Sequence, residues 1–483
     1  MLNAILYFLT LIHFITFGCL GLYGIHRIWL LLQLKNERKK CSEEIPSFNN
    51  NHPFVTIQLP IYNEKFVAGR LIDAASKINW PKDRLEIQIL DDSTDDTRDI
   101  IDKSAEYWSK KGLNINVIRR NNRNGFKAGA LSNGLKLAKG EFIAIFDADF
   151  IPEPDFLYRT IPYFSNKNIG MIQTRWSFLN ASHSWITKIQ AIFLGQHFSI
   201  EHFIRYKKGL FFNFNGTAGI WRKIAIETSG GWQSDTVTED LDLSYRAQMV
   251  GWKFIYLDNI SVPSELPITI SDFRSQQQRW AKGSIQTAKK ILPQLIFSNI
   301  SGSIKKEAIA HLMANLCWLL GTIATLTLYP AIIYRKDIVI NQILHIDLPL
   351  FIFSSFTIFI YFFLFNKLNS NKIESYTLFL LPVLTVGIAP SISLSVLKGI
   401  FSKGGDFCRT PKYGFTFKNN ISIPLAYKTK SYGYIILNMI LFFYSLLPLI
   451  FAVKNNFVAV PFLLIFPLGF GLIFLKEINE LKD

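Results

Sequence analysis

Cysteine is scarce in this sequence of 483 residues, which has only Cys19, Cys41, Cys317 and Cys408. They lie far apart without any CxxC spacing, which excludes a dense disulfide framework, and we interpret them as reduced, packing residues. GxGxxG, HExxH and Walker A patterns are also absent. The sequence therefore carries no motif of a dinucleotide-binding protein, a zinc protease or a P-loop enzyme.

Apolar and basic residues are abundant and unevenly distributed. Hydrophobic residues make up 49% of the chain and aromatic residues 14%, and they gather in separate blocks, as in a membrane protein. The net charge of +16 suits nucleic acid, anionic lipid or a phosphorylated substrate and does not distinguish among them. Basic residues follow the first apolar block (Lys35, Arg38, Lys39, Lys40) and separate two later ones (Lys398, Lys403, Arg409, Lys412, Lys418, Lys428, Lys430). The positive-inside rule places both segments on the cytosolic face.

The first apolar block, residues 4–23, is uncharged and long enough to cross a bilayer of about 30 Å. A cleaved signal peptide would carry basic residues before its apolar run, whereas here they come after it. We therefore predict an uncleaved N-terminal transmembrane anchor over residues 1–34.

Further apolar blocks indicate a C-terminal transmembrane channel region over residues 305–483. They cover residues 308–334, 348–365, 376–397, 432–453 and 457–475. If all of them crossed the membrane, the basic segment 398–431 would lie outside, against the charge rule. We expect block 376–397, which contains prolines and serines, to be re-entrant or interfacial, leaving five spans in total. A true span that contains proline is the alternative.

Between these regions, short apolar runs alternate with amphipathic stretches, which predicts an α/β catalytic domain with a mainly parallel sheet over residues 50–270. We expect strands at residues 54–59, 85–90, 115–118 and 142–146. Ligands gather at the carboxyl ends of such strands, where the sequence reads PIYNE, DDSTDD, RRNNRNGFK and DADF. An amphipathic helix at residues 271–300, rich in Trp, Arg and Lys, is expected at the membrane interface.

Two acidic motifs follow predicted strands. Asp147 and Asp149 suit a hard cation such as Mg²⁺ or Mn²⁺, although an isolated DxD is common in surface loops. The motif that begins with Asp91 and Asp92 does not fit an EF-hand, because Asp96 stands where glycine is needed. Its aspartates would either accept hydrogen bonds from a nucleoside or form a solvated turn.

Two further motifs each allow two interpretations. Lys127, with Arg123, would face a diphosphate or belong to a basic helix surface. The sequence TED, residues 238–240, would supply Asp240 as a general base, or Thr238 would simply cap a helix.

The string QQQRW contains Gln276, Arg279 and Trp280. It places a fixed cation beside a flat aromatic ring. Arg suits a departing phosphate, and Trp suits the C–H face of a sugar. Any interfacial helix can carry this pair, but its position after TED favours the functional interpretation.

Taken in order, these motifs resemble the D, DxD, TED, QxxRW signature of processive family 2 glycosyltransferases, the cellulose synthase superfamily. The similarity covers about residues 53–300, from PIYNE to QQQRWAKG. The sequences of these motifs most resemble those of plant cellulose-synthase-like mannan and glucan synthases. The resemblance implies a GT-A fold and a membrane-bound, inverting hexosyltransferase. Such an enzyme polymerises a β-linked, mannan- or glucan-like polysaccharide from a nucleotide sugar and translocates it.

The family roles carry over to matching positions. The resemblance implies donor binding by Asp91 or Asp92, Lys127, Asp147, Asp149 and Arg279; metal binding by Asp147 and Asp149; catalysis by Asp240 with Glu239; and acceptor binding by Gln276, Trp280, Asn215, Gly216 and Thr217. Phe407, Thr410 and Lys412 resemble the FxVTxK gating loop, with Arg409 in place of its valine.

The expected partners are UDP-glucose or GDP-mannose, the growing polysaccharide and membrane lipid, without nucleic acid. We expect a multi-pass protein of the inner or plasma membrane with a cytosolic catalytic domain. One alternative is a non-processive transferase that adds a single sugar to a lipid such as diacylglycerol or ceramide. Another is an inactive membrane module used for export or scaffolding.

Overall fold

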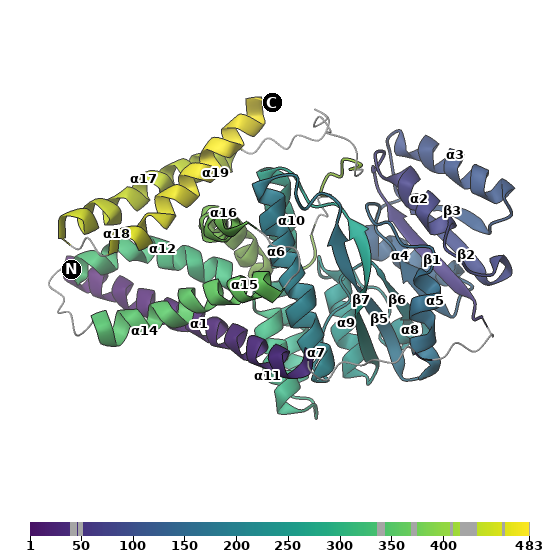
Figure 1. Ribbon diagram of the computed structural model, residues 1–483, viewed down its shortest axis with the longest axis horizontal. Coiled ribbons are helices and arrows are strands. Elements are labelled where there is room, and N and C mark those ends of the chain that lie inside the picture. Colours follow the sequence, from purple (N-terminus) through teal and green to yellow (C-terminus); the bar gives the residue numbers. More distant parts are fainter. Residues whose placement is uncertain are drawn as a thin grey trace.

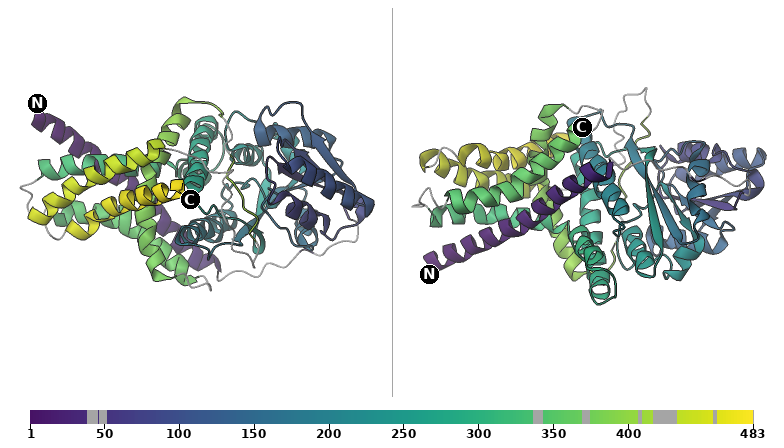
Figure 2. Two further views of the ribbon diagram at one scale, coloured as in Figure 1. Left: turned by 90° about the horizontal axis from the view of Figure 1, so that it is seen from above. Right: turned by 60° about the horizontal axis from the view of Figure 1, so that its bottom comes forward.

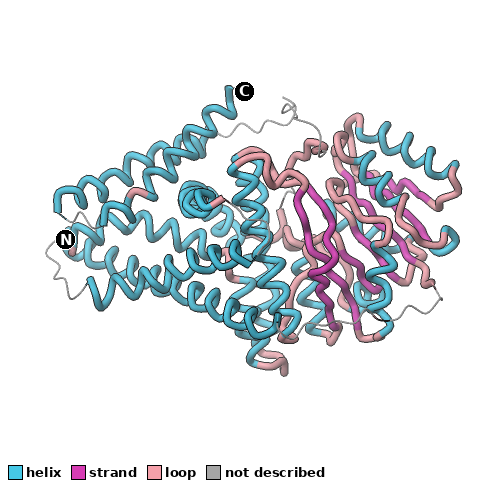
Figure 3. Tube along the Cα trace, in the orientation of Figure 1, coloured by secondary structure: helices cyan, strands magenta, loops and turns pink. Residues whose placement is uncertain are grey.

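The computed structural model describes residues 1–38, 46, 52–335, 343–368, 374–405, 409–415, 432–455 and 459–482. An α/β domain forms one end of the molecule and long apolar helices form the other (Figure 1). All the strands lie in the α/β domain, and the opposite end is helical throughout its described residues (Figure 3).

A seven-stranded sheet organises the α/β domain, in the order β3-β2-β1-β4-β6-β5-β7. Its strands are β1 (Val55–Ile61), β2 (Leu85–Asp91), β3 (Ile115–Arg119), β4 (Phe142–Ile145), β5 (Ile169–Phe178), β6 (Gly219–Arg222) and β7 (Lys253–Ser264). Only β6 runs antiparallel to its neighbours β4 and β5, whereas the other pairs are parallel. The predicted mainly parallel sheet is confirmed, and its first four strands lie where the apolar runs placed them.

Helices cover both faces of the sheet, which explains why β2 and β4 are buried at every position. They include α2 (Ala68–Ser76), η1 (Lys82–Arg84), α3 (Thr97–Lys110), α4 (Phe126–Leu137), α5 (Phe156–Thr160), η2 (Ile161–Ser165), α6 (Trp185–Gln196), η3 (His197–His202), α7 (Phe203–Lys207), α8 (Lys223–Thr228) and α9 (Glu239–Met249). One hydrophobic core joins sheet residues such as Met171 to Leu34 of the N-terminal helix and Ile392 of a later helix. The α/β domain and the apolar helices are therefore packed into one body.

The remaining helices form the other end of the molecule. They are α1 (Leu2–Arg38), α10 (Ile270–Ile296), α11 (Gly302–Leu312), α12 (Leu316–Tyr334), η4 (Ile343–Asp347), α14 (Leu348–Phe351), η5 (Ile352–Phe356), α15 (Thr357–Leu368), α16 (Ser375–Phe401), α17 (Tyr432–Asn455), α18 (Val460–Leu463) and α19 (Ile465–Lys482). Within the described residues, six helical segments are long and apolar enough to cross a membrane. These segments indicate a membrane protein.

The α16 helix differs from the other five candidates. Its most apolar window is 61% buried inside the protein, against 22–33% for the others. In Figure 1 it is seen end on, whereas α1, α12 and α17 run across the view, and Figure 2 shows the same crossed arrangement from above. It is one continuous helix despite Pro382 and Pro390, so the re-entrant form is not seen. Its transverse, sheltered position favours the interfacial alternative, and the count of five spans stays a prediction.

The α10 helix stands between the sheet and the long apolar helices (Figure 1). Its first turn is capped by Thr269, whose hydroxyl accepts a 3.1 Å hydrogen bond from the backbone N–H of Asp272. The helix packs against both α16 and α9. It covers most of the range 271–300 in which an interfacial helix was predicted, and its position brings the QQQRW string to the edge of the sheet.

Candidate active site

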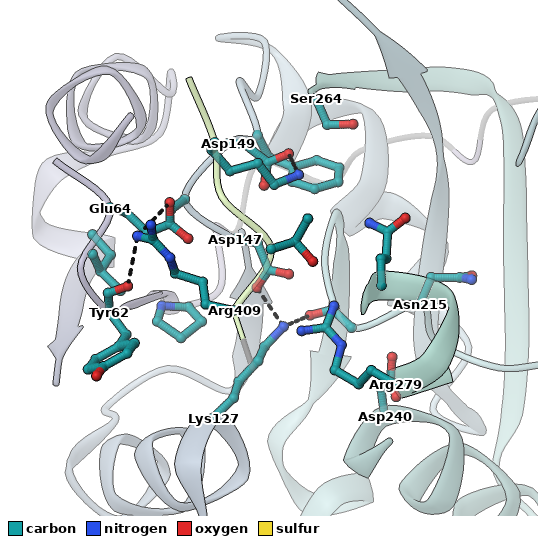
Figure 4. Close-up of a pocket in the computed structure, with 18 of the residues that line it drawn as sticks. Tyr62, Glu64, Lys127, Asp147, Asp149, Asn215, Asp240, Ser264, Arg279 and Arg409 are labelled. Atoms are coloured by element: carbon teal, nitrogen blue, oxygen red, sulfur yellow. Dashed lines mark hydrogen bonds and ion pairs between the residues drawn. The ribbon is translucent and has the colours of Figure 1, made fainter. Parts of the chain in front are cut away.

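An open cavity with about 1220 Å³ of empty space lies between the carboxyl end of the sheet, α9, α10 and the segment 409–415. Most of the predicted site residues line it: Asp92, Lys127, Asp147, Asp149, Asn215, Gly216, Glu239, Asp240, Gln276, Arg279, Trp280, Thr410 and Lys412. Figure 4 shows how several of them face one another. The structure thus brings together motifs that are up to about three hundred residues apart in the chain.

Two predicted residues, Asp91 and Thr217, do not line this cavity, and a third cannot be placed. Phe407 lies outside the described residues. Asp91 is buried, with its carboxylate held by Arg119 Nε at 2.7 Å. Thr217 was expected on the acceptor path, but it is fully buried and its hydroxyl accepts a 2.8 Å hydrogen bond from the backbone N–H of Asp147. Thr217 therefore positions Asp147 instead of forming part of the cavity wall.

Asp147 follows β4 and faces Lys127 of α4. The ammonium of Lys127 lies 2.5 Å from Asp147 Oδ1 and donates to the carbonyl oxygen of Gly216 at 2.9 Å. Burial by itself lowers the pKa of Lys127, but the carboxylates of Asp147 and Glu239 more than offset it and raise this pKa above its ordinary value. Lys127 therefore stays charged, which suits its predicted role in binding a diphosphate.

Asp149 is almost fully buried and meets the segment 409–415. Its Oδ2 accepts hydrogen bonds from Lys412 Nζ at 2.7 Å and from the backbone N–H of Glu265 at 3.1 Å. Glu265 in turn holds the segment, because its carboxylate accepts from the backbone N–H groups of Tyr413 and Phe415 at 3.0 and 2.7 Å. Residues 409–415 are thus fixed over one side of the cavity.

The two carboxylates of the DxD motif suit a divalent cation that is shared with a ligand. No group of three or more His, Cys, Asp or Glu side chains that would hold a metal occurs in the part of the chain that the structure describes. Mg²⁺ commonly takes one or two carboxylates and completes its shell with substrate phosphates and water. Asp147 and Asp149 fit that pattern, and each already faces a cationic lysine.

The acidic pair Glu239 and Asp240 begins α9. Burial, followed by the charge of Glu239, raises the pKa of Asp240 to about 7, which is close to the working range of a general base. Oδ1 of Asp240 accepts a 2.8 Å hydrogen bond from the N–H of Leu241, which keeps the carboxylate oriented. The Thr238 side chain makes no capping hydrogen bond, so the simple helix-cap interpretation of this motif does not hold.

Several polar atoms on the cavity wall are buried without a hydrogen-bond partner. Within the described residues they include Trp176 Nε1, Asn215 Oδ1, Gln276 Oε1 and Thr410 Oγ1. An unpaired buried polar group typically costs about 1–3 kcal/mol. Such atoms around one cavity indicate that it is built for a ligand with many hydroxyl groups.

The end of the cavity around Asp92 contains residues that sequence reasoning did not assign. Asp92 is held by Arg120, whose Nε donates to its Oδ1 at 3.0 Å. The guanidinium carbon of Arg123 lies 3.3 Å from the ring centre of Tyr62, and Arg409 pairs with Glu64 at 3.4 Å. The arginines of RRNNR carried a signal in their charge. Tyr62 and Glu64 lie in the strand-end motif PIYNE, but the motif gave neither residue a role of its own, and Trp176 was not assigned at all.

Residues 52–283 match the family model described as "Glycosyltransferase like family 2". Glucomannan 4-beta-mannosyltransferase 7 of Arabidopsis thaliana is 40% identical over 310 residues, covering 61% of this chain and 56% of that protein. Glucomannan 4-beta-mannosyltransferase 1 of Oryza sativa subsp. japonica is 42% identical over 281 residues, covering 56% and 54%. The chain thus spans about half the length of the curated relatives it matches.

A solved structure, the mannosyltransferase PcManGT from Pyrobaculum calidifontis in complex with GDP-Man and Mn²⁺, has a TM-score of 0.49 and 19% identity, covering 77% of this chain and 100% of that one. The residues matched by the family model include the acidic motifs and the QQQRW string that line the cavity. Residues 52–283 therefore match a family 2 glycosyltransferase domain and are similar in sequence to the glucomannan 4-beta-mannosyltransferases.

Proposed function

We propose that this protein is a membrane-bound, inverting hexosyltransferase that polymerises a β-linked polysaccharide on the cytosolic side and passes it into the membrane. The observation that carries the proposal is the position of Asp240, which shares one cavity with the diphosphate-binding candidate Lys127 and the acceptor candidate Trp280. The curated relatives named glucomannan 4-beta-mannosyltransferase favour GDP-mannose as the donor, with UDP-glucose as the second candidate.

The proposed reaction is a single displacement. Asp240 takes the proton from the terminal hydroxyl of the acceptor, and the oxygen forms a bond to the anomeric carbon of the donor sugar. The bond between that carbon and the diphosphate oxygen breaks, and the leaving nucleoside diphosphate keeps the electron pair. Because attack and departure occur on opposite faces, an α-linked donor gives a β-linked product.

The surrounding charges support the departure of the diphosphate. Lys127 stays protonated beside Asp147, and Arg279 lines the same cavity. Fixed cations stabilise the negative charge that develops on the leaving group. Mg²⁺ or Mn²⁺ bound by Asp147 and Asp149 would neutralise further charge on the diphosphate.

We propose that the acceptor lies against α10, near the buried polar atoms that line the cavity without a partner in the described residues. Trp280 offers an aromatic face to the C–H surface of a pyranose. Gln276 Oε1 and Trp176 Nε1 are buried and have no hydrogen-bond partner among the residues that the structure describes, so they offer an acceptor and a donor for sugar hydroxyls. This lining suits a saccharide acceptor better than the apolar tails of a lipid.

The test is to give the purified, membrane-reconstituted protein radiolabelled GDP-mannose or UDP-glucose with Mg²⁺ or Mn²⁺, using Asp240→Asn as the matched inactive control. We expect a long product that a β-1,4-specific mannanase or glucanase degrades. A single-sugar glycolipid as the sole product would instead indicate the lipid transferase. Absence of both transfer and donor hydrolysis would indicate an inactive module.

A further inference from the structure

A row of polar contacts behind Asn215 takes no part in the reaction as proposed so far. Nδ2 of Asn215 lies 3.1 Å from Nε2 of His197, and the other ring nitrogen of His197, Nδ1, lies 3.3 Å from Oε2 of Glu201. His197 and Glu201 both belong to η3, a π-helical stretch between α6 and α7. Stretches of π-helix inside longer helices frequently occur at functional sites.

The charge of Glu201 fixes the proton on His197. The Glu201 carboxylate is buried between two guanidinium groups, Arg27 of α1 and Arg205 of α7, the latter at 3.4 Å. A carboxylate paired in this way stays ionised and only accepts hydrogen bonds. Nδ1 of His197 must therefore carry the hydrogen of this contact.

The ring of His197 is also neutral. Burial, followed by the charges of His202, Arg205 and Arg27, holds the pKa of His197 well below its ordinary value. A neutral imidazole protonated at Nδ1 has an unprotonated Nε2, which only accepts a hydrogen bond. His197 therefore requires a donor on its cavity side.

Asn215 meets that requirement with its amide N–H₂ group, and this sets the direction of its oxygen. The backbone N–H of Asn215 donates to Gln173 Oε1 at 2.8 Å, which fixes the residue itself. The ring of His202 also lies beside this amide, but its Nε2 donates to the carbonyl oxygen of Asn213 at 2.9 Å, so the neutral ring has no hydrogen on Nδ1 for Oδ1 to accept. With Nδ2 on His197, Oδ1 is therefore left buried without a hydrogen-bond partner in the described part of the chain. In Figure 4, Asn215 lies on the side of Arg279 and Asp240, across the cavity from Tyr62.

We propose that Oδ1 of Asn215 accepts a hydrogen bond from a hydroxyl of the acceptor saccharide, and that His197 is the positioning residue that holds the amide in this orientation. The inference rests on the function proposed above and adds the means of acceptor recognition. A site with a buried oxygen that needs a donor discriminates against acceptors that lack the hydroxyl at that point. The recognition is then supported from the N-terminal helix, through Arg27 and Glu201.

The test measures the KM for a soluble β-1,4-linked oligosaccharide acceptor and the KM for the nucleotide sugar separately. In His197→Leu, the amide of Asn215 loses its partner and turns freely, so we expect the acceptor KM to rise roughly tenfold while the donor KM changes little. His197→Gln offers a side-chain carbonyl oxygen to the amide and should restore most of the acceptor affinity.

The matched control is His311→Leu, because His311 hydrogen-bonds to the hydroxyl of Tyr245 at 2.8 Å and does not line the cavity. This variant should keep the acceptor KM of the wild type. An unchanged acceptor KM in His197→Leu overturns the inference, and so does an equal rise of both KM values or a lack of rescue by His197→Gln. A wild-type protein without any sugar transfer would instead contradict the proposed function itself.

Discussion

The ammonium of Lys412 lies 2.7 Å from Oδ2 of Asp149, so a lysine of the segment 409–415 neutralises one of the two carboxylates that are expected to bind the metal. Lys412 also donates to the carbonyl oxygen of Glu265 at 2.8 Å. A divalent cation and the Lys412 ammonium would therefore compete for the same carboxylate. Metal binding and release of the segment are expected to be linked.

Removal of this ammonium should strengthen metal binding in the absence of donor. For Lys412→Gln we expect the Kd for Mn²⁺ to fall roughly tenfold, because Asp149 loses a buried ion pair that the metal has to displace. Electron paramagnetic resonance of free Mn²⁺ measures this Kd directly. Lys403→Gln, at an exposed position of the same basic region, is the control. An equal Kd in both variants would mean that Lys412 does not compete with the metal.

Asp240→Asn should abolish sugar transfer and leave donor binding intact, because the amide cannot take a proton from the acceptor hydroxyl. In the wild type, the transfer rate should rise with pH through about 7, the pKa to which burial and Glu239 raise Asp240. A rate measured at saturating donor between pH 6 and pH 8 checks this dependence. Transfer by the variant at the wild-type rate would remove Asp240 from the role of base.

Asp240→Asn should also raise the free energy of unfolding at high pH. Below the unfolded pKa of about 4, Asp240 is protonated in both states and contributes nothing. As the pH rises from about 4 to about 7, the unfolded chain loses this proton first, so the free energy of unfolding falls. Asp240→Asn avoids that loss. Its thermal unfolding temperature should therefore be higher than that of the wild type, and the difference should be largest at pH 8. A stability difference independent of pH would contradict the assignment.

Gly216 should not tolerate a side chain. It has a φ of +82°, and a Cβ atom there would lie 2.9 Å from Asp240 Oδ2 and 3.4 Å from Lys127 Nζ. We expect Gly216→Ala to reduce transfer at least tenfold, because a shift of about 1 Å in the base or the cation suffices for that. Gly209→Ala is a matched control, since Gly209 has a φ of +65° and open space around its Cβ position. A similar loss in both variants would indicate backbone strain alone.

The sequence predicts the sheet and the acidic motifs well because both depend on local pattern. The apolar runs of β1, β2 and β4 stand out against polar flanks, and Asp147 and Asp149 directly follow a strand. The sequence does not predict which of Asp91 and Asp92 faces the cavity. Neighbouring residues at a strand end face opposite sides, and the register with β3 decides which one Arg119 draws inward.

Contacts between distant segments could not be predicted at all. Nothing in the sequence near His197 indicates that Asn215 lies beside it, because the contact depends on how η3 packs under the sheet. Glu265 belongs to the string SELP, residues 264–267, but nothing in that string indicates that it fixes the segment that contains Tyr413 and Phe415. For α16, the sequence does not show that Pro382 and Pro390 leave the helix continuous, because its packing against α10, α12 and α19 involves distant segments.

Trp280 should be needed for the polymer and not for donor binding. Its ring lines the cavity next to Gln276 and Arg279 on α10, where it would stack on the terminal sugar. For Trp280→Ala we expect loss of long product with nucleotide binding retained, and for Trp280→Phe a partial return of chain length, because a smaller aromatic face remains. Gel filtration of the radiolabelled product measures chain length. Undiminished length in Trp280→Ala would exclude the stacking role.

The substitution Trp176→Phe tests whether a buried, unpaired polar atom of the cavity lining binds the acceptor, and it leaves the packing largely in place. Nε1 of Trp176 has no hydrogen-bond partner in the described residues, so Trp176→Phe removes a donor that contributes no hydrogen bond to the empty protein. Stability should therefore change little, whereas the acceptor KM should rise by roughly 3- to 10-fold if a sugar oxygen uses that donor. Trp221→Phe is the control, because Trp221 also has a buried, unpaired N–H but does not line the cavity. If the two variants gave the same acceptor KM as the wild type, the unpaired N–H of Trp176 would have no part in acceptor binding.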